Sequence, residues 1–331
     1  MMNQHDAKQS VADAGRMLLR ERLVARTWGN VSCRTGVQSF VITPSGLAYE
    51  GMTAEDVVAY NMADGTWAGT RKPSSEKGVH AAAYTQFPDA GFVIHTHQTY
   101  ASALGLAGFQ ALVLTKEQEE ALGGITLAKY GLPSTKALKN NVTAALATGA
   151  HVVLMAQHGA VIVGRDQTEA FERSKLLEAV CRAACKGLPA EGDANNTSLA
   201  ALASHAALSF SHTAYTAAPA VRETASTVKF FRAQLDDMAQ MIGPKLITVS
   251  ADGEAVANAL KKHDAVLVKG LGAVCRAESE ADCDALCLLA EKACVSFLHT
   301  NALGVAATLS KLDTLLMRTI YLTKYSKKSG K

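Results

Sequence analysis

Three histidines and one glutamate have the residue types and the spacing of a metal site. His95 and His97 are separated by one residue in the run GFVIHTH, whose apolar and β-branched residues predict a strand. Side chains alternate along a strand, so both imidazoles would point to the same face. His158 lies in a tight segment between two apolar runs, and Glu76 begins a helical pattern. Three imidazoles and one carboxylate match the ligand types and the four-coordinate preference of Zn²⁺.

Each of these features also has a simpler interpretation. Pairs of histidines at this spacing are common, and both rings could be hydrogen-bonded side chains of the core or the surface. The two serines before Glu76, Ser74 and Ser75, could cap the helix, although capping explains only one of them. The histidine pair alone therefore does not establish a metal site, and the prediction depends on all four residues together.

Three short loops combine small residues with polar or hydroxyl side chains. They are GNVS around Asn30, TPSG around Ser45, and the serine pair before Glu76. A helix start with free backbone N–H groups attracts anions, and loops of this kind can surround a phosphate. Turns are built from the same residues, so the loops indicate a phosphate site only beside the metal cluster.

The elements that would position these residues alternate between helical and strand patterns. Helical patterns cover residues 6–25, 53–62, 76–88 and 166–187, and strand patterns cover 39–43, 91–97 and two buried runs within 151–164. Gly29 and Asn30 predict a turn between the first helix and a strand, and Thr53 followed by Asp56 predicts a helix start. Helices and strands mix throughout, so the fold class is α/β or α+β.

The composition of the 331-residue chain is that of a globular protein, with 48% hydrophobic and 19% charged residues. The 33 basic and 30 acidic side chains leave a net charge of +3, and much of this excess lies in the tail KYSKKSGK. A solvated tail explains that charge, so we expect no nucleic-acid partner. The opening MMNQHDAKQS has no apolar signal region, and no apolar run reaches the ~18 residues of a membrane span. We therefore expect a cytoplasmic protein without a membrane partner.

The second half of the chain predicts a linker and a diverged repeat. Residues 188–227 are small and polar with two prolines, which predicts a linker around a weak helix. Within a second unit at 228–331, residues 267–294 align without a gap on 154–181 and place Leu271 opposite His158. We therefore predict a partial repeat without a metal site, with a role in packing or assembly. The seven cysteines lack CxxC spacing and are expected to be reduced, and four of them are expected to be buried in helices of this unit, namely Cys275, Cys283, Cys287 and Cys294.

Five motifs resemble, in order and spacing, the class II aldolase/adducin family. They are GNVS at 29–32, ITPSG at 42–46, SSE at 74–76 followed by His80, HTH at 95–97, and QHGAVIVG at 157–164. This family contains L-fuculose-1-phosphate aldolase and L-ribulose-5-phosphate 4-epimerase. The resemblance covers about residues 8–187, so we expect a metal-binding catalytic domain over 1–187. It implies an α/β fold of three layers, α/β/α, with a mainly antiparallel central sheet, followed here by a smaller diverged α/β unit.

The resemblance also implies roles for single residues. His95, His97 and His158 are similar to the metal ligands of the family, which hold one Zn²⁺ or another divalent ion per chain. Glu76 is similar to its catalytic acid/base and to the fourth ligand of the resting state. The phosphate contacts of the family correspond to Asn30, Thr43, Ser45, Gly46, Ser74 and Ser75. The implied partners are a small sugar phosphate and further copies of the chain, commonly in a homotetramer with active sites between subunits.

These implications predict a zinc-dependent aldolase that cleaves a phosphorylated ketose by retro-aldol chemistry through a metal-stabilised enediolate. Glu76 would leave the metal and move protons at the enediolate carbon. Epimerases of the family tend to carry aspartate at this place, so glutamate favours the aldolase. A sugar-phosphate 4-epimerase or dehydratase using the same metal, and a non-catalytic adducin-like interaction module, are the alternatives. The complete set of ligands favours an enzyme, whereas the fold alone would not.

Two departures from the family pattern bear on the pocket. Lys77 follows Glu76 where family members more often have bulky apolar residues, and it either adds positive charge near the phosphate or points to solvent. The tyrosine that the family takes from a neighbouring subunit has no secure counterpart, because Tyr100 and Tyr130 are both possible. The group that protonates the leaving aldehyde is therefore unassigned.

Overall fold

The computed structural model describes residues 2–109, 112–192 and 196–325. Within this part of the chain there are two units, residues 1–184 and 185–331, and each has a sheet of its own. Residues 193–195 of the predicted linker and residues 326–331 of the predicted basic tail lie outside the described ranges.

The first unit is built on a seven-stranded sheet with the order β3-β2-β1-β4-β7-β6-β5. Its strands are β1 (Asn30–Gly36), β2 (Ser39–Ile42), β3 (Val58–Asn61), β4 (Phe92–Thr96), β5 (Ile125–Ala128), β6 (Val152–Met155) and β7 (Gly159–Gly164). The pairings described in this sheet are antiparallel, except for β5 with β6. The prediction of a mainly antiparallel sheet is confirmed.

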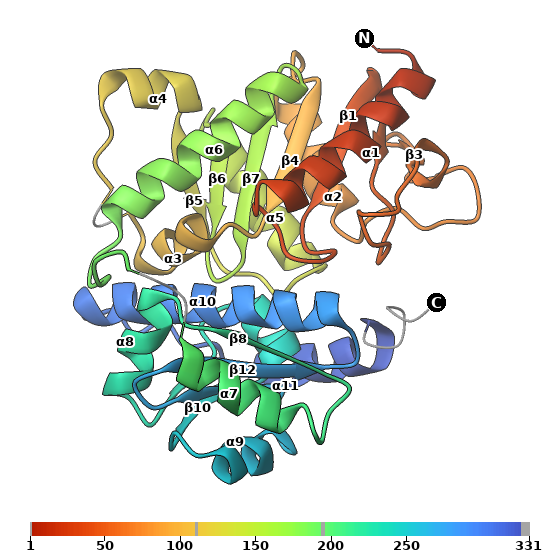
Figure 1. Ribbon diagram of the computed structural model, residues 1–331. Helices are drawn as coiled ribbons and strands as arrows, with labels where there is room; N and C mark the ends of the chain where they lie inside the picture. The colour runs from red at the N-terminus through yellow and green to blue at the C-terminus, as the bar shows by residue number, and fades with distance from the viewer. Residues whose placement is uncertain (1, 110–111, 193–195, 326–331) are drawn as a thin grey trace. The chain divides into compact units, whose positions relative to one another are not determined.

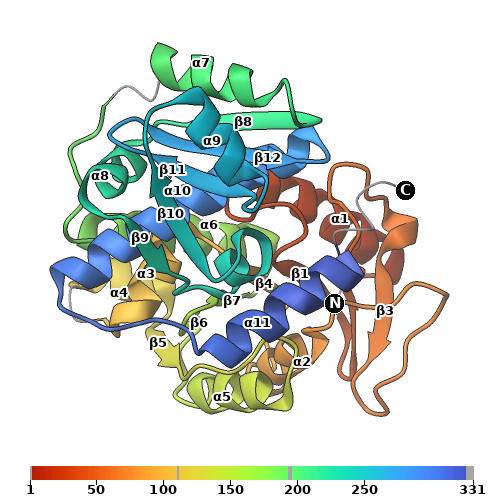
Figure 2. The ribbon, with the colours of Figure 1, turned by 90° about the horizontal axis from the view of Figure 1, so that it is seen from below.

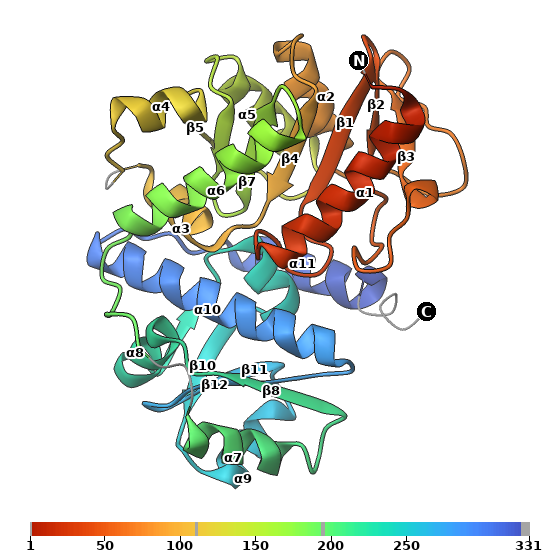
Figure 3. The same ribbon diagram turned by 45° about the horizontal axis from the view of Figure 1, so that its top comes forward.

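Helices cover both faces of this sheet (Figures 1 and 3). They are α1 (Gln4–Arg20), α2 (Lys77–Gln86), α3 (Thr99–Ala107), α4 (Lys116–Leu122), α5 (Lys136–Leu146) and α6 (Gln167–Ala184). Ile94 of β4 packs in the core beneath α1 and α6, whereas its neighbour Val93 packs in the core beneath α2 and α5. Because successive side chains of a strand point to opposite faces, the unit has three layers, as predicted.

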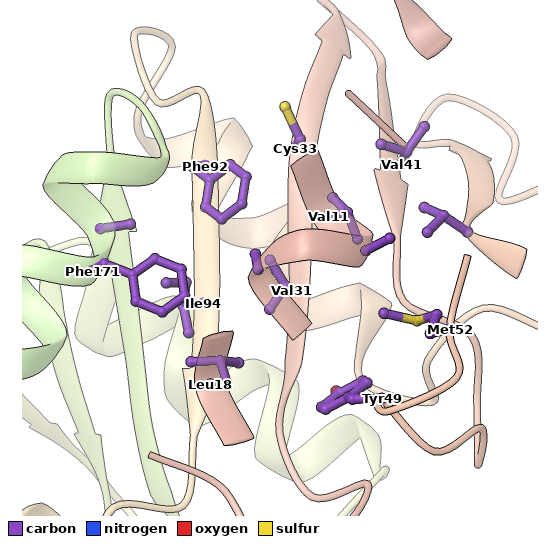
Figure 4. Packing of buried hydrophobic residues seen from close by; sticks show 14 of the residues in the cluster. Val11, Leu18, Val31, Cys33, Val41, Tyr49, Met52, Phe92, Ile94 and Phe171 are labelled. Atoms are coloured by element: carbon purple, nitrogen blue, oxygen red, sulfur yellow. The ribbon is translucent and has the colours of Figure 1, made fainter. Parts of the chain in front are cut away.

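The core beneath α1 shows why this segment forms a helix. Val11 and Leu18 are seven residues apart and therefore lie on the same face of the helix. Both pack against Val31 of β1 and Ile94 of β4 (Figure 4). At the start of the helix, the Asn3 side chain accepts a hydrogen bond from the backbone N–H of Asp6 at 3.0 Å. An apolar stripe and an N-cap together fix α1 across β1, and α1 thereby covers the strand that carries Asn30.

Two sequence predictions in the first unit are wrong in detail. Asn30 is not in the turn but is the first residue of β1, because the turn needs only Gly29, which has φ +90°. Residues 53–62 form a helix only at Ala54–Asp56, with the expected capping box at Thr53, and then continue as strand β3. The β-branched pair at 57–58 favours extended backbone, and pairing with β2 outweighs the helical signal.

The β6–β7 hairpin makes a tight turn that carries His158. Gln157 adopts a left-handed conformation with φ +63°, and the backbone N–H of His158 donates to the carbonyl of Met155 at 3.1 Å. Gly159 follows directly, and a Cβ there would lie 2.0 Å from the carbonyl oxygen of Thr96. Only glycine allows β7 to approach β4 this closely, so the turn is held beside the end of β4.

The second unit contains a five-stranded sheet with the order β8-β12-β11-β10-β9 (Figure 2). Its strands are β8 (His212–Thr216), β9 (Phe230–Arg232), β10 (Lys245–Val249), β11 (Ala265–Val268) and β12 (Gly272–Ala277). Its helical segments are α7 (Thr197–Ala206), α8 (Pro219–Thr227), η2 (Met238–Ile242), α9 (Gly253–Leu260), α10 (Glu280–Ala302), α11 (Lys311–Ile320) and η3 (Tyr321–Tyr325).

The structure differs from the prediction of a linker over 188–227. This stretch contains α7, β8 and α8, and β8 pairs with β12 in the sheet of the second unit. Alanine and small polar residues misled the sequence interpretation, because they build these two short helices while resembling a loop in composition. One of the four cysteines expected in helices, Cys275, lies instead in β12, and all seven are free thiols.

The second unit repeats part of the topology of the first. The helix–strand–helix run α2, β4, α3 recurs as α7, β8, α8 at a constant offset of 120 residues, for example Lys77 to Thr197 and Thr96 to Thr216. The hairpin β6–β7 recurs as β11–β12, again with a parallel neighbour strand and a following helix. The repeat therefore begins inside the predicted linker.

All four predicted ligand positions differ in the repeat. The offset places Asn196 at the position of Glu76 and Tyr215 at the position of His95, while Ala217 corresponds to His97. Leu271 takes the place of His158 in the hairpin turn. Within the described residues of this unit, the repeat keeps the sheet and lacks the ligands. No helix in the described part of the chain is long and apolar enough to cross a membrane.

We expect Gly159→Ala to destabilise the first unit strongly, because the added methyl group would overlap a backbone oxygen that cannot move without disturbing β4. The loss should be about 3 kcal/mol in the free energy of unfolding, measured by urea titration. Gly51→Ala is the matched control, since a Cβ at Gly51 meets nothing within 4 Å. Equal stability of the two variants would contradict the close approach.

Candidate metal centre

Three imidazoles converge at the end of β4. The Nε2 atom of His95 lies 3.1 Å from Nε2 of His97 and 3.0 Å from Nε2 of His158. All three residues are buried, and none is more than 8% exposed to solvent. His97 lies one residue beyond the end of β4, and its backbone N–H donates to the carbonyl of Leu23 at 3.2 Å. The structure thus brings together the three histidines that the sequence singled out.

Glu76 completes the cluster from the start of α2. It is the N-cap residue of this helix, and its carboxylate lies 3.1 Å from His95 Nε2 and 3.3 Å from His158 Nε2. Burial alone would raise the pKa of Glu76, but the charges of His95 and His158 and their hydrogen bonds hold that pKa well below its usual range. The carboxylate is therefore held in its charged form.

The orientation of His95 leaves its inner nitrogen available for a metal. Its Nδ1–H donates to the carbonyl oxygen of Ala160 at 2.9 Å, so the lone pair is on Nε2, which faces the cluster. The turn of His158 is held on its other side by Ser102, whose hydroxyl donates to the carbonyl of His158 at 3.4 Å. Both candidate ligands are thus fixed by contacts with the backbone.

This donor set fits a divalent cation. The candidate ligand atoms of His95, His97 and His158 all lie within 4.8 Å of one another. Nitrogen lone pairs that point at one another repel unless a proton or a cation lies among them. In their deprotonated forms, three imidazoles and one carboxylate are the nitrogen and oxygen donors that Zn²⁺ accepts in four-coordinate sites, so a bound cation would replace the protons among them.

Most of the predicted phosphate contacts lie around Glu76. The backbone of Thr43 pairs with that of Ser74 through a 3.0 Å hydrogen bond, and the N–H of Ser45 donates to the carbonyl of Lys72 at 2.9 Å. These contacts lay the loop that contains Gly46 beside the chain that leads into α2. Asn30 reaches the same place from β1, because it pairs with His95 across the sheet.

The two serines before the helix have different environments. The hydroxyl of Ser74 accepts a hydrogen bond from the backbone N–H of Glu76 at 3.2 Å. Because Glu76 itself is the N-cap residue and α2 has no side-chain cap hydrogen bond, this is a local turn and not the helix cap that the sequence allowed for one serine. Ser75 is exposed, and its hydroxyl accepts from that of Ser134 at 2.9 Å. Of the pair, Ser74 therefore lies against Glu76, while Ser75 faces away from the buried histidines.

The structure shows the contacts of Lys77, Tyr100 and Tyr130, the three residues at which the sequence departs from the family pattern or leaves it open. The ammonium of Lys77 lies 6.0 Å from the centre of the Trp67 ring, so this side chain crosses an aromatic face. Tyr100 is the second residue of α3. Its backbone N–H donates to the carboxylate of Glu178, and its ring packs under the guanidinium of Arg182. The carbonyl of Tyr130 accepts a hydrogen bond from Asn141 at 2.8 Å.

Sequence reasoning missed a set of polar residues behind the cluster. His80 and Tyr84 of α2 bond to Asn30 and Ser32 of β1 within the buried interior. The available signal was the spacing: Glu76, His80 and Tyr84 follow one another at four-residue intervals on a helix. In the sequence, His80 belongs to the motif that begins with SSE, and the motif alone assigns it no role.

Comparison with known proteins identifies the family. The family model described as Class II Aldolase and Adducin N-terminal domain matches residues 9–185. The chain belongs to this family. The match contains Glu76 and all three histidines, and it ends where the second unit begins.

The chain is similar to a curated epimerase and to two solved structures. The L-ribulose-5-phosphate 4-epimerase UlaF of Salmonella paratyphi B is 34% identical over 198 residues, which cover 54% of this chain and 83% of the epimerase. A crystal structure of YgbL from Klebsiella pneumoniae has a TM-score of 0.50 and 23% identity, covering 55% of this chain and 90% of YgbL. An L-fuculose 1-phosphate aldolase structure has a TM-score of 0.49 and 28% identity, covering 54% of this chain and 84% of the aldolase.

We expect the purified protein to hold about one Zn²⁺ or similar divalent ion per chain, bound in the first unit. Replacing both His95 and His97 by alanine should abolish this binding, because two of four ligands are lost. Metal content measured by elemental analysis checks the expectation. His151→Ala is the control, since His151 bonds to Gly123 in the same unit, outside the cluster. Full metal content in the double variant would contradict the site.

Proposed function

We propose that the protein is a zinc-dependent lyase that cleaves a phosphorylated ketose by a retro-aldol reaction. The observation that carries the proposal is the convergence of His95, His97 and His158 with the carboxylate of Glu76 in one buried cluster. Loops with hydroxyl and amide groups surround that carboxylate. A donor set for one cation next to polar donors for an anion fits a substrate with both a carbonyl group and a phosphate.

The reaction breaks the bond between the carbon next to the carbonyl and the hydroxyl-bearing carbon beyond it. The hydroxyl gives its proton to a base of the pocket, which is the unassigned group at the aldehyde oxygen, and becomes the carbonyl group of the aldehyde. The electron pair of the broken carbon–carbon bond moves toward the carbonyl oxygen of the other fragment. A bound divalent cation supplies the positive charge that stabilises the oxygens of the substrate as this negative charge develops. The protein must then return a proton to the carbon that lost its partner.

Glu76 is the group proposed for that proton. Its side chain is 10% exposed, it lies within 3.3 Å of two proposed ligands, and as N-cap of α2 it stands at the positive end of a helix. The carboxylate can exchange contacts with the imidazoles for contacts with the substrate while Asn30 still donates to Oε2 at 3.2 Å. It can therefore carry a proton without leaving the pocket.

The phosphate is proposed to lie against the loops that follow β2 and precede α2. Asn30, Thr43 and Ser74 are buried beside Glu76, and Ser45 and Gly46 are partly exposed on the outer side of the same loop. Ser75 is the weakest member of the proposed set, because its hydroxyl is engaged with Ser134. Neutral donors around one anion would orient the substrate without competing for the cation.

A 4-epimerase is the second candidate, and the 34% identity to UlaF favours it. An epimerase could break the same carbon–carbon bond and then form it again on the other face of the aldehyde. The hydroxyl-bearing carbon of that bond would thereby be inverted. The glutamate at position 76, where epimerases resembling this chain tend to carry aspartate, favours the aldolase. The two reactions differ in whether the fragments are released.

A screen of ketose phosphates distinguishes the two candidates. The Zn²⁺-loaded protein is incubated with pentulose and hexulose 1-phosphates and with pentulose 5-phosphates. Release of dihydroxyacetone phosphate or glycolaldehyde phosphate would support the aldolase, whereas conversion to an epimer without free fragments would support the epimerase. Absence of both reactions in the metal-loaded protein would contradict the proposed function and favour an interaction module.

The second unit and the assembly complete the proposal. We propose that the repeat serves packing or assembly, because it keeps the sheet topology and carries asparagine, tyrosine, alanine and leucine at the four ligand positions. The proposed assembly is a homo-oligomer, with the tetramer of the resemblance as the first expectation. Light scattering of the full chain measures this state directly.

We expect Glu76→Gln to lower kcat by about a hundredfold or more, a typical loss for a general acid/base, while most of the metal is retained. Three imidazoles can still hold zinc, but the amide cannot exchange a proton. Initial rates on the true substrate and metal analysis check both parts. Glu172→Gln, at an exposed position of α6, is the control. A wild-type rate in Glu76→Gln would show that another group moves the proton.

A further inference from the structure

A chain of buried hydrogen bonds runs from α2 and β1 to the carboxylate of Glu76. Tyr84 Oη lies 2.9 Å from Ser32 Oγ, which lies 2.6 Å from Nδ1 of His80. Nε2 of His80 bonds to Oδ1 of Asn30, and Nδ2 of Asn30 donates to Oε2 of Glu76 at 3.2 Å. His80 and Ser32 have no exposed surface, and Asn30 is 5% exposed. The middle of this series of hydrogen bonds is therefore shielded from bulk water.

Side chains of β1 and α2 alternate along this series of hydrogen bonds because the spacing of residues on the strand matches that on the helix. Glu76, His80 and Tyr84 lie on one face of α2 at intervals of four residues, and Asn30 and Ser32 lie on one face of β1 at an interval of two. Each strand residue bonds to two successive helix residues. This regular arrangement makes the side chain of Asn30 the link between His80 and the carboxylate.

The direction of every bond follows from the carboxylate end. An ionised carboxylate only accepts hydrogen bonds, so the NH₂ group of Asn30 must face Glu76 and its carbonyl oxygen must face His80. His80 must then donate from Nε2 and accept at Nδ1 from the hydroxyl of Ser32. Burial, aided by the charge of His95, lowers the pKa of His80 to about 3, which agrees with a neutral ring.

We propose that His80 is a positioning residue for the acid/base carboxylate: its Nε2–H holds the amide of Asn30 in the orientation that donates to Oε2 of Glu76. This proposal rests on the proposed function, in which Glu76 moves the proton. Because Oε2 accepts from Asn30, the bond favours Oε1 as the oxygen that carries the proton. His80 thus fixes the orientation in which the carboxylate meets the substrate.

Asn30 also belongs to the proposed phosphate contacts, and that role makes a different prediction. If His80 acted through the phosphate contact of Asn30, loss of its orientation would weaken substrate binding and raise KM. If His80 acts through Asn30 on Glu76, the loss would fall on kcat, because the misplaced carboxylate transfers its proton more slowly while substrate binding is unchanged.

Two substitutions at one position separate these roles. The amide nitrogen of glutamine can reach the place of His80 Nε2, whereas the shorter asparagine reaches only the place of Nδ1. We expect His80→Asn to lower kcat by about ten- to a hundredfold with KM within about twofold, and His80→Gln to recover most of the rate. A merely structural role would make both variants similarly slow and similarly unstable. His151→Asn controls for loss of an imidazole elsewhere in the unit.

A readout independent of turnover tests the contact itself. With Co²⁺ in place of Zn²⁺, the visible absorption bands report the geometry around the metal. We expect His80→Asn, but not His80→Gln, to shift these bands, because Glu76 loses its fixed orientation while the three histidines stay in place. Melting temperatures of the two variants should agree within a few degrees.

The tautomer of His80 decides the proposal. In the Zn²⁺-loaded protein with ¹⁵N-labelled histidine, we expect Nε2 of His80 to carry the proton and Nδ1 to be unprotonated. A proton on Nδ1 instead, or a raised KM with unchanged kcat in His80→Asn, would overturn it. If no ketose phosphate is turned over, the proposed function fails, while unchanged Co²⁺ bands in His80→Asn would separately show that His80 does not orient Glu76.

Discussion

The antiparallel register between β1, β4 and β7 is the constraint on which the rest of the first unit depends. It sets Asn30 opposite His95 and Thr96 opposite Ala160, so that Glu76, the histidine pair and His158 can meet in one place. A shift by one residue would turn His95 toward the opposite face, into the core beneath α1 and α6. Buried polar groups without partners cost free energy, so the register and the polar cluster support each other.

The second unit separates the sheet from its chemistry. Its hairpin has the same turn, with Gly272 pressed against the carbonyl of Thr216 as Gly159 is pressed against that of Thr96. Leu271 nevertheless replaces the histidine, and Tyr215 stands where His95 does. The tight glycine contact therefore belongs to the fold, whereas the imidazoles belong to the site. Function in this architecture depends on a few side chains placed on a sheet that can exist without them.

Local signals in the sequence were sufficient for some parts of this site and not for others. The strand pattern around His95 and the helix start at Glu76 were predictable, because strand alternation and helical periodicity are properties of neighbouring residues. The position of Asn30 in β1 was not, because the Gly-Asn pair resembles a turn and only pairing with β4 makes Asn30 a strand residue. The role of His80 needs the further knowledge that α2 and β1 face each other.

The hairpin turn before His158 also has an energetic consequence. Gln157 occupies a left-handed conformation with φ +63°, whereas the repeat has Gly270 at the same point with φ +73°. For a residue with a side chain this conformation costs about 1 kcal/mol, which glycine avoids. The unit that carries the histidine is thus locally the less relaxed of the two. This strained residue directly precedes a proposed ligand, so a cation bound to His158 would offset the cost by stabilising the folded hairpin.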